Sequence, residues 1–272
     1  MIEAIADATA VGSATLSVIV PAYNEEATLE NVVREVLRLP QLTELIIVDD
    51  GSTDATAQVC QKLASLPKVR VVRQPRNQGK CAALKAGFAI STGEIVIVQD
   101  ADLEYDPSEI PSVIGPIIAG KADVVYGSRF LVKKASRILY FYHYLANKGL
   151  TLFSNLLTNV NFTDIETGYK AFRGEIIRNM VLTSKAFGIE IEVTAKIAKL
   201  GCAIYEVPIS YYGRTYEQGK KIGLSDGLMA LWYIVRFNLF CSLESSFVNL
   251  PVLSTQDDPH SAENLLTGSF RE

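Results

Sequence analysis

The chain has 272 residues, of which 49% are hydrophobic and 21% are charged, and its formal net charge is −4 at pH 7. This length and composition are typical of a globular protein with a full core, in one large domain or two small ones. Because the net charge is negative, no global basic field exists to hold nucleic acid. We therefore expect no nucleic-acid partner, and we expect local positive groups to hold any anionic ligand.

The cysteines and histidines exclude several kinds of chemistry. The four cysteines show no C-x-x-C spacing, and no signal-peptide pattern precedes them, which favours reduced thiols in a cytoplasmic protein. Neither His143 nor His260 has a Ser or Cys nucleophile signature around it. The sequence therefore predicts chemistry that relies on carboxylates, a metal ion or bound phosphate.

Two apolar segments have several interpretations. The sequence contains no run of 18 uncharged apolar residues, so it does not predict a transmembrane helix. The segment "LMALWYIVRFNLF" (228–240) contains Arg236 and has the length of a core helix or of a helix lying in a membrane interface. For this segment and for "YFYHYL" (140–145), we consider core packing, an oligomer contact and a membrane contact as alternatives.

In chain order, short β-rich runs alternate with helical patterns over the first 127 residues. The expected strands are "LSVIV" (16–20), "LIIVD" (45–49), "VRVV" (69–72), "EIVIV" (94–98) and "DVVYG" (123–127). The expected helices run from near Asn24 to Pro40 and over 54–66, 80–90 and 107–119. This alternation predicts an α/β fold whose mostly parallel sheet has helices on both faces, as in nucleotide-binding proteins.

The pattern changes after residue 127. Helical material is expected over about 134–159, followed by a polar loop, a helix to about 200 and an edge strand in "AIYEVPISYY" (203–212). Residues 1–14 and the end of the segment 242–272 have the composition of flexible tails. One domain is therefore expected over 15–241, with a nucleotide-binding half (15–127) and a second, more helical half (128–241).

Four polar segments follow the expected strands. They are "PAYNEE" (21–26), "DDGSTD" (49–54), "PRNQGK" (75–80) and "DADLE" (100–104). Each has an alternative explanation in turn chemistry, since Asn24 and Ser52 can cap helices and Gly79 can adopt a positive φ. Ligands bind beyond the carboxyl ends of the strands in open α/β sheets, so four such segments at one edge predict a ligand site.

The segment "DADLE" predicts a metal site for a bound nucleotide. An Asp-x-Asp turn can face a hard divalent ion, which also binds diphosphate oxygens. If the segment is extended, alternation directs Asp100, Asp102 and Glu104 to one side. We expect Asp106, which precedes Pro107, to cap the following helix instead.

Seven segments together resemble family 2 nucleotide-sugar glycosyltransferases, and within that family the polyprenyl-phosphate sugar transferases typified by dolichol-phosphate mannose synthase. In order, they are "VIVPAYNEE", "IIVDDGSTD", "NQGKCAALKAGF", "DADLE", "GSRF", "DIETGYKAFR" and "GRTYEQGKK", and the match covers about residues 16–227. The resemblance implies a GT-A fold with a helical, acceptor-side C-terminal part, an inverting transfer, and Mg²⁺ or Mn²⁺ as cofactor. The implied donor is a GDP- or UDP-sugar.

The resemblance also assigns residues to the donor and the metal ion. The residues expected to hold the base and ribose are Pro21, Tyr23, Glu25, Val48 and Asp50. Those expected to line the rest of the donor site are Lys80, Asp100 and Ala101. Asp102 and Glu104 are expected to bind the metal ion, with Asp100 as a further candidate ligand. The family's mannose synthases often have Gln where Glu104 stands, and this departure leaves the donor's identity open.

A second group of residues is assigned to catalysis and to the acceptor. Arg129 in "GSRF" is similar to a family arginine that faces the sugar or its phosphates. Arg214 and Lys220 resemble a pair in a flexible loop that clamps the donor diphosphate and acceptor phosphate, and we expect this loop to close over bound donor. Lys170 and Arg173 are candidates for an acceptor-phosphate pocket.

The resemblance implies sugar transfer to a polyprenyl phosphate, either dolichyl or undecaprenyl. Such an acceptor is already ionised at neutral pH, so no protein base is required. If the acceptor is instead a soluble glycan or another hydroxyl, Asp164 is the candidate base. A non-catalytic nucleotide-sugar binding protein is a further alternative. We expect a cytoplasmic protein with peripheral contact to the cytoplasmic face of a membrane, and its oligomeric state is open.

Overall fold

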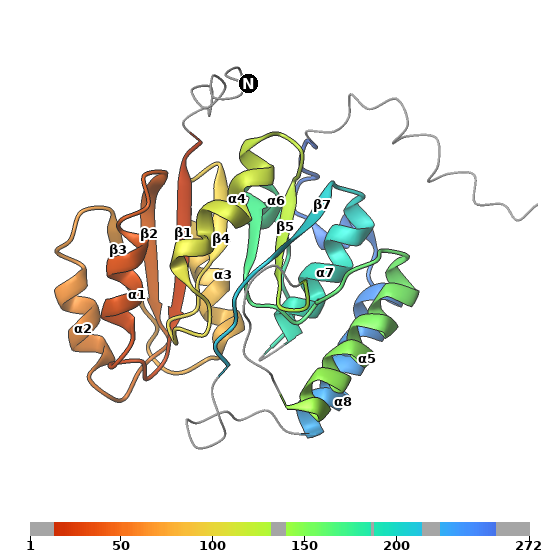
Figure 1. The fold of residues 1–272 in the computed structure, drawn as a ribbon, viewed down its shortest axis with the longest axis horizontal. Coiled ribbons are helices and arrows are strands. Elements are labelled where there is room, and N and C mark those ends of the chain that lie inside the picture. The colour runs from red at the N-terminus through yellow and green to blue at the C-terminus, as the bar shows by residue number, and fades with distance from the viewer. Residues whose placement is uncertain (1–13, 132–139, 186–187, 214–223, 254–272) are drawn as a thin grey trace, which may run out of the picture.

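The protein is built around one mixed sheet. The computed structural model describes residues 14–131, 140–185, 188–213 and 224–253, and within these residues the sheet has seven strands in the order β3-β2-β1-β4-β6-β5-β7 (Figure 1). The strands are β1 (Leu16–Ala22), β2 (Leu42–Asp49), β3 (Val69–Arg73), β4 (Ile95–Val98), β5 (Val124–Ser128), β6 (Lys170–Arg173) and β7 (Ile204–Pro208). The predicted edge strand is confirmed, since β7 lies at the end of this order.

Most strand pairs are parallel, as the alternation of strands and helices predicts. Strand β1 pairs in parallel with β2 and β4, β2 pairs with β3, and β5 pairs with β7. Strand β6 is antiparallel to both of its neighbours, β4 and β5. Strand β6 was not predicted, because its four residues, "KAFR", carry a charge at each end and form no apolar run.

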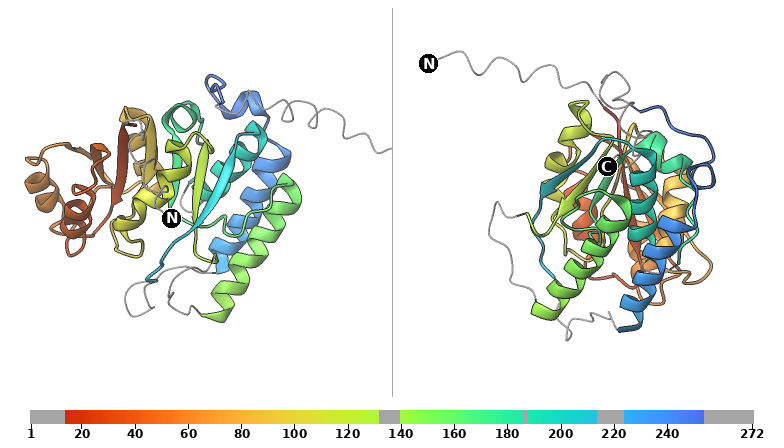
Figure 2. Two further views of the ribbon diagram at one scale, coloured as in Figure 1. Left: turned by 45° about the horizontal axis from the view of Figure 1, so that its top comes forward. Right: turned by 90° about the vertical axis from the view of Figure 1, so that its right-hand side faces the viewer.

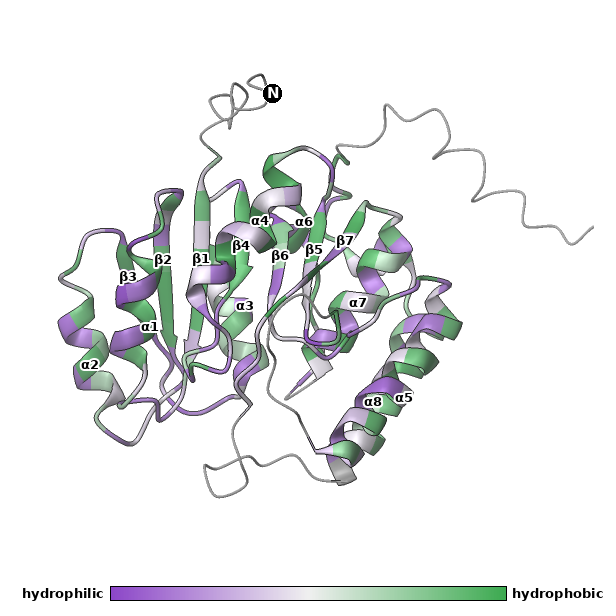
Figure 3. Cartoon of the chain, viewed as in Figure 1, coloured by the Kyte–Doolittle hydropathy of each residue, from purple (hydrophilic) through white to green (hydrophobic). Residues whose placement is uncertain are grey.

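Helices cover both faces of the sheet (Figures 1 and 2). One face packs against α1 (Leu29–Val36), α2 (Thr56–Leu63) and α4 (Ile110–Ile118). The other packs against α3 (Lys80–Ile90), α6 (Gly174–Asn179) and α7 (Ile189–Leu200). The central strands consist mainly of hydrophobic residues (Figure 3), and they contribute to the hydrophobic clusters on both faces of the sheet, which explains their continuous apolar runs.

The structure corrects the predicted start of one helix and confirms one predicted cap. Helix α1 begins at Leu29, because Asn24 is in the left-handed region at φ 55° and accepts a hydrogen bond from the Thr53 amide instead of capping the helix. Asp106 caps the 3₁₀ turn η1 (Pro107–Glu109) by accepting from the Ser108 amide at 2.8 Å, so this prediction is confirmed.

Helices α5 (Phe141–Thr158) and α8 (Leu224–Leu239) lie side by side outside α7 (Figures 1 and 2). Helix α8 buries Tyr233, Ile234 and Phe237 and exposes Trp232, so the segment 228–240 is partly core and partly surface. Among the described residues, no helix is long and apolar enough to cross a membrane.

The C-terminal extension begins with ordered structure. Helix α9 (Leu243–Ser246) is capped by Ser242, and Phe247 forms a β-bridge with Met180. The predicted tails at residues 1–13 and 254–272 lie outside the described residues.

Candidate active site

The loops after β1 and β2 are fastened to each other at the carboxyl edge of the sheet. The Asn24 amide donates to Ser52 Oγ at 3.1 Å, and the Glu25 amide donates to Thr56 Oγ1 at 2.8 Å. Tyr23 is 42% exposed beside them, and Pro21 is half-buried. The predicted base and ribose residues at the end of β1 therefore form one surface with the loop after β2.

Two predicted residues at the end of β2 and directly after it differ in their contacts. Val48 is fully buried in the cluster that packs on α3, so its side chain belongs to the core and does not line a site, contrary to our expectation. Asp50 is 2% exposed and accepts hydrogen bonds from the amides of Gln78 at 2.9 Å and Gly79 at 2.7 Å. Asp50 thus holds the loop that leads to Lys80.

Gly51 allows this loop to approach closely. Its φ is +68°, and a Cβ built there would lie 2.5 Å from the backbone carbon of Arg76. Any L side chain at position 51 would therefore push the loop away.

Lys80 lies between carboxylates from two other elements. Its Nζ is 2.8 Å from each Asp100 oxygen and 3.7 Å from Glu190 Oε1. Burial lowers the pKa of Lys80, but Asp100 and Glu190 outweigh that effect, so the pKa is raised and the side chain stays charged. Because Asp100 is paired with Lys80, this geometry does not present it as a metal ligand.

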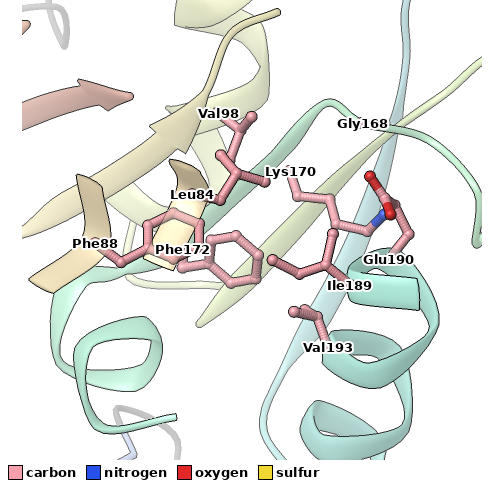
Figure 4. Close-up of a pocket in the computed structure, with 9 residues that line it drawn as sticks. All are labelled: Leu84, Phe88, Val98, Gly168, Lys170, Phe172, Ile189, Glu190 and Val193. Carbon is pink, nitrogen blue, oxygen red and sulfur yellow. The ribbon is translucent and has the colours of Figure 1, made fainter. Parts of the chain in front are cut away.

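Glu190, at the start of α7, was missed by the sequence analysis. It reaches the site from the second half of the chain, and it lines a small cavity together with Lys170 (Figure 4). The cavity is otherwise apolar, with a volume of about 20 Å³, enough for one water molecule. The available signal was "GIEIEV" (188–193), in which two carboxylates interrupt an apolar pattern.

The segment after β4 is a turn and not an extended strand. Leu103 has φ 61°, and Asp102 Oδ1 accepts from the Glu104 amide at 3.1 Å. Ala101 is buried under this turn. Glu104 is directed toward Tyr211, whose hydroxyl donates to Glu104 Oε2 at 2.8 Å, while Asp100 faces Lys80. The alternation expected for an extended segment therefore does not apply to these three carboxylates.

Arg129 is locked in place by Asp164. The guanidinium donates from Nε and Nη2 to the two Asp164 oxygens, both at 2.7 Å, and the Arg129 amide donates to the same carboxylate. Burial raises the pKa of Asp164, but Arg129 outweighs burial and the pKa is lowered. A buried carboxylate with both oxygens bound and a lowered pKa is a poor general base, so these contacts disfavour Asp164 as the candidate base.

The two basic residues of β6 lie at opposite ends of that strand. Lys170 pairs with Tyr126 of β5 toward the carboxyl edge of β5, whereas Arg173 pairs with Ile95 at the start of β4 and forms an ion pair with Asp123 at 3.1 Å. Arg173 is therefore far along the sheet from the loops described above, and the expectation that it shares a phosphate pocket with Lys170 is wrong.

Lys170 is buried near two carboxyl groups. Its Nζ donates to the carbonyls of Ile165 and Thr167 and lies 4.6 Å from the centre of the Tyr126 ring. Burial lowers the pKa of Lys170 to about 8. Burial, with repulsion from Glu190, raises the pKa of Glu166 to about 7. Glu190 connects this group to Lys80, whose Nζ lies 3.7 Å away, and Gly168 adjoins both Asp100 and Lys80.

The acidic turn fits a divalent ion that is held partly by protein carboxylates and partly by the phosphates of a bound substrate. In the described part of the chain, no three acidic, His or Cys side chains come together as a complete metal site. Mg²⁺ is commonly held by one or two carboxylates together with substrate phosphates, and Asp102 and Glu104 suit that mode. The predicted loop residues Arg214 and Lys220 lie outside the described residues.

A family comparison agrees with this arrangement. Residues 17–180 match the profile described as glycosyl transferase family 2, which is more than half of the chain. The chain belongs to glycosyl transferase family 2. It is therefore a glycosyltransferase, and the loops at the carboxyl edge of its sheet form its candidate active site.

Named relatives in this family extend over most of the chain. A dolichol-phosphate mannosyltransferase of Pyrococcus furiosus is 31% identical over 214 residues, which are 76% of this chain and 59% of that relative. This chain therefore spans less than two thirds of the length of that relative. A polyprenol monophosphomannose synthase of Mycolicibacterium smegmatis is also 31% identical over 214 residues, covering 76% of this chain and 80% of the relative.

The solved structures support the fold. A glucosyl-3-phosphoglycerate synthase from M. tuberculosis superposes with a TM-score of 0.65 at 23% identity, over 83% of this chain and 81% of that chain. The predicted GT-A fold, with a mostly parallel sheet covered by helices, is confirmed.

Proposed function

We propose that this glycosyltransferase moves a sugar from a GDP- or UDP-sugar to a polyprenyl phosphate, with inversion at the anomeric carbon and with a bound Mg²⁺ or Mn²⁺. The observation that carries the proposal is the position of the Arg129–Asp164 pair. It lies between the acidic turn, reached through Tyr211, and the start of the apolar helix α5, reached through Phe130. A fixed cation between a metal-diphosphate site and an apolar surface suits a lipid phosphate acceptor.

The donor side of the proposal uses the loops after β1, β2 and β4. In this proposal, Tyr23, Glu25 and Asp50 contact the base and ribose, and Asp102 and Glu104 bind the metal ion. The ion would stabilise negative charge on the leaving diphosphate. The M. tuberculosis glucosyl-3-phosphoglycerate synthase has been solved with Mn²⁺ and UDP and with Mg²⁺ and UDP, which supports divalent metal use in this fold.

The acceptor side needs no protein base. A phosphate oxygen is already anionic at neutral pH, and it attacks the anomeric carbon from the face opposite the diphosphate. Arg129 would orient that phosphate, and Asp164 keeps the guanidinium in position. Arg214 and Lys220 remain predicted partners of the two phosphate groups. The names of the P. furiosus and M. smegmatis relatives, a dolichol-phosphate and a polyprenol enzyme, support a lipid acceptor.

The surface of α5 and α8 suits a membrane contact. Its exposed large apolar residues include Phe141, Tyr142, Leu152, Leu156, Leu228, Met229, Trp232 and Phe240. Apolar and aromatic side chains of this kind bury in a membrane interface. The start of α5 adjoins the site directly, because the Tyr144 and Phe130 rings are 5.3 Å apart and Lys148 Nζ lies 4.3 Å from the Phe130 ring centre. A polyprenyl chain could thus remain in the bilayer while its phosphate reaches Arg129.

Transfer from radiolabelled sugar nucleotides tests the function. The expected result is label in a lipid fraction only when polyprenyl phosphate and a divalent ion are both present. Label transferred to soluble glycans without lipid would favour the hydroxyl-acceptor alternative. Donor binding without transfer to any acceptor would favour the non-catalytic alternative. Binding to vesicles, compared between the wild type and Trp232→Ser, tests the membrane contact separately.

A further inference from the structure

Tyr211 contacts both parts of the candidate active site. It follows β7 and is 8% exposed. Its hydroxyl donates to Glu104 Oε2 at 2.8 Å, and its ring lies 5.2 Å from Arg129 Cζ and 5.4 Å from the Tyr105 ring. One side chain therefore connects the acidic turn to the arginine proposed to bind the acceptor phosphate.

The hydroxyl bond is separate from the contact that holds the two segments together. The Tyr212 amide donates to the Glu104 carbonyl at 2.9 Å, so the backbone alone fastens the acidic turn to the end of the edge strand. Removing the Tyr211 hydroxyl would leave this backbone bond, and it would leave the aromatic ring against Arg129. What it would remove is the restraint on the Glu104 carboxylate.

That restraint matters for a metal ligand. A glutamate side chain on a turn has several rotamers, and ion binding must select one of them. A carboxylate can accept about four hydrogen bonds, so accepting from Tyr211 is compatible with ligating an ion. Groups that orient a ligating side chain typically change metal affinity about 10- to 100-fold when they are removed.

We propose that Tyr211 is a positioning residue: its hydroxyl holds Glu104 in the orientation that binds the divalent ion, and its ring forms one wall of the Arg129 site. This inference rests on the proposed metal-dependent function. It predicts that two variants separate the two roles. Tyr211→Phe loses only the hydroxyl, whereas Tyr211→Leu also loses the aromatic wall beside Arg129.

The test is calorimetric titration of Mn²⁺ into protein saturated with UDP or GDP, together with nucleotide titration in EDTA. Tyr211→Phe is expected to raise the Mn²⁺ dissociation constant about 10-fold and to leave metal-free nucleotide affinity unchanged. Tyr212→Phe is the matched control, because it removes a hydroxyl from the adjacent, exposed tyrosine, and it is expected to bind Mn²⁺ as the wild type does. At saturating Mn²⁺, Tyr211→Leu should lower kcat more than Tyr211→Phe does.

A double variant tests whether the hydroxyl acts through Glu104. If it does, adding Tyr211→Phe to Glu104→Gln should cause little further loss of Mn²⁺ affinity. Wild-type Mn²⁺ affinity in Tyr211→Phe, or equal effects of Tyr211→Phe and Tyr212→Phe, would overturn the inference while leaving the proposed function intact. A wild-type protein that binds no Mn²⁺ with either nucleotide would overturn the metal-dependent function and this inference with it.

Discussion

Lys80 and Asp100 form an ion pair between the start of α3 and the end of β4, with Lys80 Nζ 2.8 Å from each carboxylate oxygen. Gly168 covers this pair. A Cβ at position 168 would lie 2.8 Å from Asp100 Oδ2 and 3.1 Å from Lys80 Nζ. A side chain at position 168 would therefore require the Asp100 carboxylate to shift.

Gly168→Ala should separate Lys80 from Asp100 and weaken binding of the nucleoside diphosphate about 10-fold, or about 1.4 kcal/mol. Calorimetric titration of UDP and GDP measures this loss. Gly115→Ala in α4 is the control, because a Cβ there meets nothing within 4 Å. Equal nucleotide affinity in Gly168→Ala and Gly115→Ala would show that the pair does not contribute to donor binding.

Asp164→Asn and Arg129→Lys distinguish an anchoring role for Asp164 from a role as base. Each variant breaks the two-bond pairing of these buried side chains. Asp164→Asn also removes one charge of a buried pair, which costs about 3–5 kcal/mol of stability. If Asp164 only positions Arg129, the two variants should lower the transfer rate by similar factors. Steady-state rates at saturating donor provide the measurement. A far larger loss in Asp164→Asn, confined to hydroxyl acceptors, would restore the base assignment.

Asp102→Asn should abolish metal-dependent transfer and leave the fold intact, because one carboxylate charge is lost without a change in size. Asp106→Asn is the matched control, since Asn also caps helices and Asp106 is engaged with the Ser108 amide. Turnover with Mg²⁺ or Mn²⁺ and thermal unfolding should be compared for both variants. Full activity of Asp102→Asn would contradict the metal assignment.

The stability of the protein should depend on pH through Glu166. Burial raises the pKa of Glu166 to about 7 from an ordinary value of 4.5, so the folded state binds this proton more tightly than the unfolded chain does. The resulting stabilisation is full below about pH 4.5 and is lost as the pH rises through about 7. Glu166→Gln keeps a neutral side chain at all pH values, so it should not show this loss.

Thermal unfolding between pH 5 and 7.5 measures the difference, with the variant gaining on the wild type as the pH rises. This pH range lies below the pKa of Lys170, which burial lowers to about 8. Deprotonation of Lys170 would change the stability of the protein in the direction opposite to deprotonation of Glu166. Glu35→Gln changes an exposed carboxyl on α1 and should run parallel to the wild type. A constant difference between Glu166→Gln and wild type across the range would exclude Glu166 as the titrating group.

The sequence predicted the structure correctly where local patterns of residues determine it. The strands β1 to β5, the helix at 80–90 and the cap at Asp106 follow from apolar runs and capping residues, and the polar segments at the ends of β1, β2 and β4 do gather at one edge. It was a poor guide to side-chain direction. Leu103 at φ 61° turns the acidic segment so that Glu104 faces Tyr211, 107 positions away.

The predictions for Asp164 and Arg173 failed because the roles of these residues depend on partners that are distant in the sequence. Asp164 has the residue type of a base, but its role depends on Arg129, which the topology brings beside it. Arg173 and Lys170 are three residues apart on a strand whose antiparallel direction places Arg173 beside Asp123. Neither local propensity nor spacing contains that information, because both relationships depend on where β6 inserts.

The insertion of β6 has a consequence for how the chain folds. Strand β5 lies within the first 128 residues, yet among the described strands it pairs only with β6 and β7, both of which come from beyond residue 169. A fragment ending near residue 128 would therefore keep β1 to β4 but leave β5 without a neighbour. We therefore expect that residues 15–127 do not fold as an autonomous unit. Pairing of β5 must wait for strands about 45 and 80 residues downstream, so such contacts should form late, and a chain emerging from the ribosome should complete its sheet only after β7 has been synthesised.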